Sequence, residues 1–132
     1  MPEPIESVIS PWMPITEPHK IAALAKAIEE QAELIGALSR CLMAGFDEFD
    51  PKSKLPNIEE VNKEYTDAKA TMRYLARVEP RLQSYPDRAE GKIRGFERWH
   101  RMIDERLAAE QSDEAAAAFV EGNHGSSEAS SS

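Results

Sequence analysis

The feature that most constrains the fold is a long helical stripe in the first third of the chain. Apolar residues recur there at spacings of three and four: Ile21, Leu24, Ala25, Ile28, Ala32, Ile35, Leu38 and Leu42. This spacing places all of them on one face of an α-helix. It predicts a helix over residues 19–44, and Gly45 is expected to end it.

A polar loop and a second helix are expected next. Residues 45–56 contain two prolines and three acidic residues without periodicity, which predicts a loop between antiparallel helices. Asn57 begins a second helical pattern, which continues to about Val78 before Pro80. We expect the Asn57 side chain to cap the first turn, with Glu60 reaching back to complete a capping box.

The last part of the chain predicts further helices and no strand. Ser84 or Asp87 can cap a third helix, whose apolar positions are Ile93, Phe96, Trp99, Ile103 and Leu107. Phe96 and Trp99 are expected in the core or in a subunit interface. Residues 112–120 predict a short separate helix, and the Gly- and Ser-rich residues 122–132 predict disorder.

These patterns predict an all-α bundle of antiparallel helices, completed by oligomerisation. Five prolines up to Pro18 predict an extended N-terminal arm over residues 1–18. A helical domain is expected over 19–110, with a short helix and a tail over 111–132. A chain of 132 residues is sized for one domain, so a ligand site would borrow walls from a second subunit.

Charge and cysteine content exclude several classes of protein. The formal net charge of −8 argues against a general nucleic-acid binder, since phosphates are held by surplus Lys and Arg. The single cysteine, Cys41, permits no intramolecular disulfide and favours a reducing compartment. We expect its side chain to be buried. No signal peptide and no apolar run of about 20 residues is present, so a cytoplasmic protein without membrane contact is expected.

Two groups of carboxylates predict a metal site. Glu29, Glu30 and Glu33 lie within about one turn, and Glu64 and Asp67 lie three residues apart on the second helix. If these helices pack antiparallel, the two groups converge and offer oxygen ligands to Mg²⁺ or Mn²⁺. The alternative is an ordinary solvated acidic face, which is common on helices.

The same residues carry a resemblance to a known family. Residues 29–33 read E-E-Q-A-E and residues 64–67 read E-Y-T-D. They resemble the E-E-x-x-E and E-x-x-D motifs of the MazG-like nucleoside triphosphate pyrophosphohydrolases. The resemblance implies a MazG-like helical bundle, with two or more Mg²⁺ or Mn²⁺ ions held by Glu29, Glu30, Glu33, Glu64 and Asp67. It also implies a homodimer or homotetramer.

A phage and prophage branch of that family is similar over residues 19–100. The likeness lies in His19-Lys20, in residues 39–42, in the loop 45–57 and in Arg98-Trp99-His100. Some members, called MazZ, hydrolyse dGTP, so dGTP or GTP is the favoured substrate and the host cytoplasm the expected compartment. The Tyr65-Thr66 pair, Lys69 and the long gap before Glu64 depart from the family pattern.

The resemblance implies cleavage between the α and β phosphates, giving a monophosphate and pyrophosphate. Glu30, Glu33 and Glu64 are the catalytic candidates, one of which would act as general base. Six further residues are candidate substrate contacts: Lys26, Trp12, His19, Lys69, Thr71 and Arg73.

Several of these candidates have structural alternatives. Lys26 can pair with Glu30, and the charges of Lys69 and Arg73 can offset Glu64 and Asp67. Trp12 can anchor the arm, and His19 can cap the first helix. Two other functions stay open: a non-enzymatic helical interaction module, and another metal-assisted phosphate hydrolysis.

Overall fold

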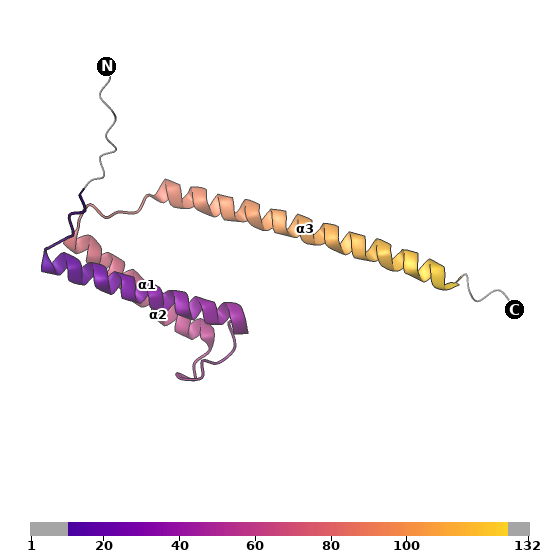
Figure 1. Ribbon diagram of the computed structural model, residues 1–132, viewed down its shortest axis with the longest axis horizontal. Helices are drawn as coiled ribbons and strands as arrows, with labels where there is room; N and C mark the ends of the chain where they lie inside the picture. Colours follow the sequence, from indigo (N-terminus) through magenta and orange to yellow (C-terminus); the bar gives the residue numbers. More distant parts are fainter. Residues whose placement is uncertain (1–10, 127–132) are drawn as a thin grey trace, which may run out of the picture. The chain divides into compact units, whose positions relative to one another are not determined.

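A computed structural model describes residues 11–126, which form three α-helices and no named strand (Figure 1). These are α1 (Pro18–Ala44), α2 (Asn57–Val78) and α3 (Pro86–Ser126). The all-α prediction is therefore confirmed for the described residues, while most of the N-terminal arm and the last six residues lie outside them. None of the described helices is both long enough and apolar enough to cross a membrane.

The chain divides into two units, Met1–Gln83 and Ser84–Ser132. Helices α1 and α2 belong to the first unit and lie side by side as an antiparallel hairpin (Figure 1). Helix α3 belongs to the second unit.

Helix α1 has a defined cap at each end. The Glu17 carboxylate accepts hydrogen bonds from the backbone amides of His19 (3.1 Å) and Lys20 (2.7 Å), and Pro18 occupies the first turn. The residue that caps the helix is therefore Glu17, not His19. At the other end Gly45 adopts a φ of 94° and donates its amide to the Cys41 carbonyl at 2.8 Å. The prediction that Gly45 ends the helix is confirmed.

The predicted capping box at the start of α2 is wrong. Pro56 is the N-cap residue, and the structure shows no side-chain capping bond there. The Asn57 side chain is buried and instead donates to the Gly45 carbonyl at 2.9 Å. The loop returns to the end of α1, so the carbonyl of Gly45 is the partner within reach of Asn57. Asn57 therefore ties the two helix ends together.

The loop between the helices is held by Asp50. Its carboxylate accepts hydrogen bonds from the amides of Lys52 and Ser53, both at 2.9 Å, and forms an ion pair with Arg40 at 3.3 Å. These backbone bonds are the main reason that the pKa of Asp50 is lowered. An isolated bridge between Phe49 and Pro56 closes the loop.

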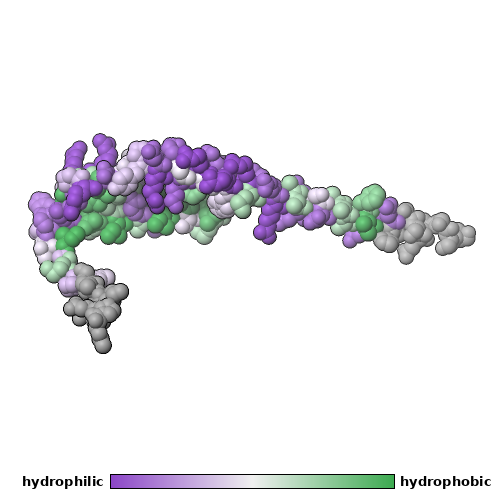
Figure 2. Space-filling view, turned by 90° about the horizontal axis from the view of Figure 1, so that it is seen from above, coloured by the Kyte–Doolittle hydropathy of each residue, from purple (hydrophilic) through white to green (hydrophobic). Residues whose placement is uncertain are grey.

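The core of the first unit is small and built mostly from alanine. Its buried apolar residues are Ala23, Ala27, Ala37, Cys41, Ala68 and Leu75. The expectation that Cys41 is buried is confirmed. Larger apolar side chains remain open to solvent, and Figure 2 shows hydrophobic residues (green) at the surface. A hairpin with such a core leaves apolar surface available for further contacts.

Helix α3 is continuous over 41 residues. The prediction of a separate helix at residues 112–120 is wrong, and so is the prediction of disorder for residues 122–126. No proline or glycine interrupts the alanine-rich sequence between Gly95 and Gly122, so the helix continues through Ser112. Phe96 and Trp99 are 58% and 57% exposed, so neither is a core residue. Their place in a subunit interface stays a prediction.

Replacing Asn57 with alanine is expected to lower the free energy of unfolding by about 1 kcal/mol, because the bond to Gly45 is lost in a buried setting. Chemical denaturation measures this change. The exposed Asn62, also on α2, provides the control: Asn62→Ala is expected to change stability little. Equal effects of the two substitutions would contradict the role assigned to Asn57.

Candidate metal centre

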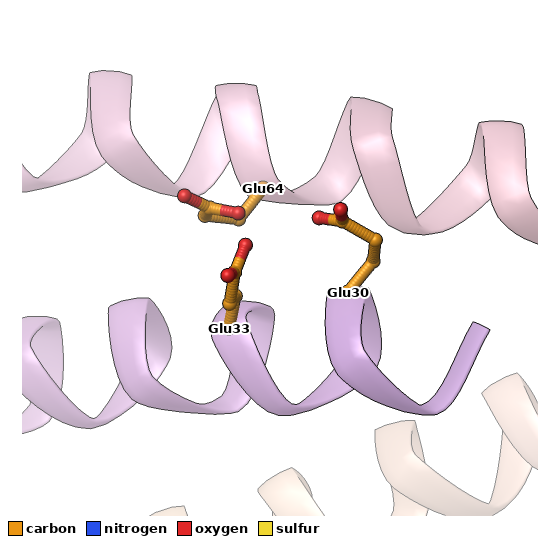
Figure 3. A group of neighbouring side chains, drawn as sticks. All are labelled: Glu30, Glu33 and Glu64. Carbon is orange, nitrogen blue, oxygen red and sulfur yellow. The ribbon is translucent and has the colours of Figure 1, made fainter. Parts of the chain in front are cut away.

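Three carboxylates from the two helices of the hairpin meet at one point. Glu30 and Glu33 on α1 and Glu64 on α2 each contribute an oxygen, and these three oxygens lie within 4.8 Å of one another (Figure 3). We call this group the glutamate triad. Glu30 and Glu33 share a face of α1 because they are three residues apart. Glu64 reaches them from the facing helix.

Small residues between the helices make this meeting possible. Ala23, Ala27 and Ala37 on α1 and Ala68 on α2 are buried, with exposures from 1% to 5%. Side chains of this size let two helices approach closely. Because Ala27 lies one turn before Glu30 and Ala68 one turn after Glu64, the close approach occurs beside the triad.

The triad is partly buried and incompletely hydrogen-bonded. The Glu30 side chain is 16% exposed, whereas the neighbouring Glu29 is 55% exposed. One oxygen of Glu30 and one of Glu64 are buried without a hydrogen-bond partner. An unpaired buried carboxylate oxygen is costly, so these two atoms favour an additional positive ligand.

The local charges raise the pKa values of two triad members. Burial is the main cause of the raised pKa of Glu30, and the negative charges of Glu33 and Asp67 add to it. Burial also dominates the raised pKa of Glu64, followed by the charges of Glu33, Asp67 and Glu60. A bound divalent cation would oppose this repulsion and favour the ionised forms.

The structure does not bring the other two predicted ligands into the triad. Asp67 is exposed, and it acts on Glu30 and Glu64 through its charge. Glu29 is exposed on α1, and its carboxylate pairs with Lys26 at 3.1 Å. Their role as ligands stays a prediction. Both are close enough in sequence to the triad to belong to a larger acidic site.

Lys26 is the basic residue of α1 closest in sequence to the triad. Its ammonium lies 3.1 Å from Glu29 and 3.9 Å from Glu30. The alternative of a helical ion pair is therefore present in the structure, with Glu29 as the nearer partner. The hydrogen bond to Glu29 is the main reason that the pKa of Lys26 is raised. A phosphate at the triad would compete with Glu29 for this ammonium.

Two candidate substrate contacts lie near the start of α1. The backbone amide of His19 donates to Glu17, and His19 is exposed. Trp12 is 94% exposed, so it does not anchor the arm on the described part of the chain. Because Glu30 lies three turns further along α1 than His19, the structure does not bring these residues to the triad.

Lys69 and Arg73 lie on the other side of α2. They follow Glu64 by five and nine residues, which places them about 140° and 180° around the helix. The Lys69 ammonium lies 5.3 Å from the centre of the Tyr65 ring, and Arg73 lines the same surface groove. Among the described residues, neither Lys69 nor Arg73 forms an ion pair with Glu64 or Asp67, as had been expected if their charges offset each other.

Thr71 remains inside its own helix. It is half-buried, and its hydroxyl donates to the Ala68 carbonyl at 2.7 Å. That bond is a local one, typical of threonine in a helix. A ligand contact for Thr71 stays a prediction.

Two residues near the triad were not singled out as site residues from the sequence. Glu60 is buried, pairs with Lys63 at 3.4 Å, and adds to the repulsion on Glu64 one turn away. The amide of Gln31 donates to the Ala68 carbonyl at 3.5 Å, which connects α1 to α2 beside Glu30. The four-residue spacing of Glu60 and Glu64 on one helix face could have indicated Glu60 from the sequence. No sequence pattern predicts the contact of Gln31 with Ala68.

The donor set fits Mg²⁺ or Mn²⁺. Carboxylate oxygens are the ligands that these hard cations prefer, and such cations commonly retain several waters. Three carboxylates leave room for those waters or for phosphate oxygens. No cysteine or histidine belongs to the triad, which disfavours a structural zinc site.

Stability without metal is expected to fall as the pH rises above about 4.5. The folded chain holds protons on Glu30 and Glu64 more tightly than the unfolded chain does, so stability is lost between their ordinary pKa and their raised values. Glu79 has the opposite effect on stability below pH 4.5, because its pKa is lowered to about 2, chiefly by a hydrogen bond with Arg81. Its contribution is lost as the pH falls toward 2.

Thermal unfolding across this pH range, with and without Mn²⁺, measures both effects. Mn²⁺ is expected to raise the melting temperature mainly on the high-pH side, where the triad is ionised. If Glu30→Gln and Glu64→Gln leave the pH dependence of the melting temperature unchanged, the loss of stability at higher pH does not come from the triad.

Comparison of the chain with protein-family models, with curated proteins and with solved structures finds no match. The resemblance carried by residues 29–33 and 64–67 thus remains a hypothesis. The geometry of the triad is the independent observation that bears on it.

Proposed function

We propose that this chain is a metal-dependent nucleotide pyrophosphohydrolase that cleaves a nucleoside triphosphate between its α and β phosphates. The observation that supports this most is the glutamate triad, in which both acidic motifs take part. Glu30 and Glu33 come from the E-E-x-x-E motif and Glu64 comes from the E-x-x-D motif. An acidic cluster alone is common on helical surfaces. In this one Glu33 is exposed, but Glu30 and Glu64 are partly buried, and one carboxylate oxygen of each is buried without a hydrogen-bond partner.

The triad would hold a divalent cation, and Glu29 and Asp67 would complete the site for a second ion. When bound, the cations supply charge neutralisation for the phosphates and lower the pKa of a water. Water attacks the phosphorus, the bond to the bridging oxygen breaks, and a monophosphate and pyrophosphate leave. A carboxylate of the triad that is not coordinating accepts the proton from the attacking water.

Lys26 would bind a phosphate oxygen of the substrate. Its ammonium already stands beside Glu29 and Glu30, and its contact with Glu29 is solvent-exposed. An exposed ion pair contributes little to stability, so exchanging Glu29 for a phosphate costs little. The expected substrate is dGTP or GTP, which rests on the motif resemblance alone.

We also propose that the protein works as a homodimer or homotetramer. The hairpin carries an apolar groove of about 460 Å³, lined by Leu24, Ala27, Ile28, Gln31, Ala32, Ile35, Met72 and Leu75. Ile28 and Ile35 are 69% and 64% exposed. A second copy that covers this groove would bury apolar surface which the small alanine core leaves open.

The test is incubation of the purified chain with Mn²⁺ or Mg²⁺ and each of the common nucleoside triphosphates and deoxynucleoside triphosphates. Chromatography of the products is expected to show the monophosphate and pyrophosphate, with the guanine nucleotides fastest. Diphosphate and phosphate would indicate another hydrolysis at the same site. The variant Glu33→Gln should remain folded and lose turnover, which would link the activity to the triad.

A non-enzymatic interaction module is the second candidate function, and the exposed apolar groove favours it. Such a module needs no cation. Calorimetric titration of Mn²⁺ into the wild type, Glu30→Gln and Asp67→Asn separates the two functions. Absence of cation binding by the folded wild type, together with absence of turnover, would leave the interaction module as the better description.

A further inference from the structure

Helix α3 carries an apolar seam with a seven-residue repeat. Positions Ile93, His100 and Leu107 are seven residues apart, and so are Ala89, Phe96 and Ile103. The two series alternate at spacings of three and four, as the a and d positions of a coiled coil do. His100 is the one polar residue among these six.

The seam is exposed on the described helix. Ile93, Phe96, Ile103 and Leu107 are 47%, 58%, 38% and 50% exposed. It ends after Leu107, because the next two positions of the repeat are Glu110 and Glu114. The seam therefore covers residues 89–107, which is about 28 Å of helix. A helix with one such face ordinarily buries it against another helix.

The charges beside the seam are sorted by sign. Glu90, Glu97 and Asp104 repeat every seven residues along one flank, at the e positions. Lys92 and Arg106 lie on the opposite flank, at g positions, with Trp99 between them. Lys92 and Glu97 form no ion pair within the described part of the chain, although both are exposed there. One flank is thus acidic and the other is largely basic.

This sorting suits a second copy of the same helix in parallel orientation. In a parallel pair related by a twofold axis, the g flank of one helix faces the e flank of the other. Lys92 then faces Glu97 of the partner subunit, five residues further along, and the reciprocal pair forms too. In an antiparallel pair each flank would face its own copy, so acids would oppose acids. Arg106 is already paired with Glu110 of its own helix at 3.2 Å, so the Lys92–Glu97 contact is the charged pair that favours the parallel direction.

We propose that two copies of this chain pair through residues 89–107 of α3 as a parallel two-stranded coiled coil. The pairing stands apart from the proposed hydrolase activity, since it uses no residue of the triad. It also differs from covering the groove of the hairpin, so the two contacts together can give a tetramer. His100 at an a position weakens the pair and limits its register, as polar residues at such positions do.

Sedimentation of the full chain over a dilution series tests the seam. The double substitution of Phe96→Ser and Ile103→Ser is expected to weaken association at least about 100-fold. The control combines Met102→Ser with Phe119→Ser, which removes exposed apolar side chains off the seam and should leave association unchanged. Equal sedimentation of the wild type and the seam variant overturns the proposal.

A charge exchange tests the flanks without removing apolar surface. Lys92→Glu should weaken association about fivefold through repulsion by the partner's Glu97. Adding Glu97→Lys should restore it, because the reciprocal pairs form again with reversed sign. Failure of the second substitution to restore association argues against these contacts and overturns the parallel arrangement.

Crosslinking tests the direction directly. In a Cys41→Ala background, Ala89→Cys should form a disulfide between two copies, whereas Arg98→Cys on the opposite face should not. An antiparallel pair would separate the two introduced cysteines by about 27 Å. A disulfide that forms only between Ala89→Cys and Leu107→Cys chains would therefore overturn the parallel pairing.

Discussion

Replacing Glu64 with glutamine is expected to weaken Mn²⁺ binding at least about 100-fold and to abolish pyrophosphate release. Glu64 is the one triad member on α2, so its loss leaves only ligands from α1. Even residues that only orient a ligand typically change metal affinity about 10–100-fold. Removing a directly coordinating carboxylate should exceed that range. Titration calorimetry and product chromatography measure the two effects.

The same substitution should leave the metal-free fold intact or make it slightly more stable at neutral pH. The raised pKa of Glu64 shows that its ionised form is disfavoured in the folded chain, and a neutral amide removes that repulsion. Glu59→Gln is the matched control, because Glu59 is exposed on the same helix. Retained Mn²⁺ affinity in Glu64→Gln, with both variants folded, would refute the metal centre.

Enlarging the alanine contact between the helices should damage both stability and the site. Ala68 is 2% exposed, so Ala68→Leu would force α1 and α2 apart. Overpacking of this kind ordinarily costs about 1–3 kcal/mol of unfolding free energy. The separation would also move Glu64 away from Glu30 and Glu33. We therefore expect a lower midpoint of denaturation together with weaker Mn²⁺ binding.

The control is Ala70→Leu, two residues further along the same helix. Ala70 is exposed, so the added side chain meets solvent and should change neither property much. If Ala68→Leu lowered stability but kept full Mn²⁺ affinity, the close approach of the helices would not be what positions the triad. If neither variant differed from the wild type, the packing described for the hairpin would be wrong.

Much of the helical content was readable from local patterns. The apolar stripe of α1, the glycine at its end and the start of α2 at Asn57 were all predicted, because periodicity and backbone preference act within a few residues. The errors also have local explanations. No proline or glycine separates residues 112–120 from the preceding helix, so α3 continues through them.

The tertiary structure decided what the polar side chains contact. Asn57 was expected to cap its own helix, but the returning loop places the Gly45 carbonyl within its reach. Lys69 and Arg73 were expected to act at the acids of α2, yet their spacing of five and nine residues from Glu64 already places them on the other side of that helix. The partner of Asn57 is remote in sequence, so no spacing rule predicts that contact.

By itself, the sequence determined the helices over residues 19–44 and 57–78, the loop between them, and an acidic group on each helix. Only the packing of α1 on α2 determined that Glu30, Glu33 and Glu64 share one point while Glu29 and Asp67 lie beside it. The reason is that helix formation depends on neighbours along the chain. A site between two helices depends on their distance and rotation, which here follow from four buried alanines.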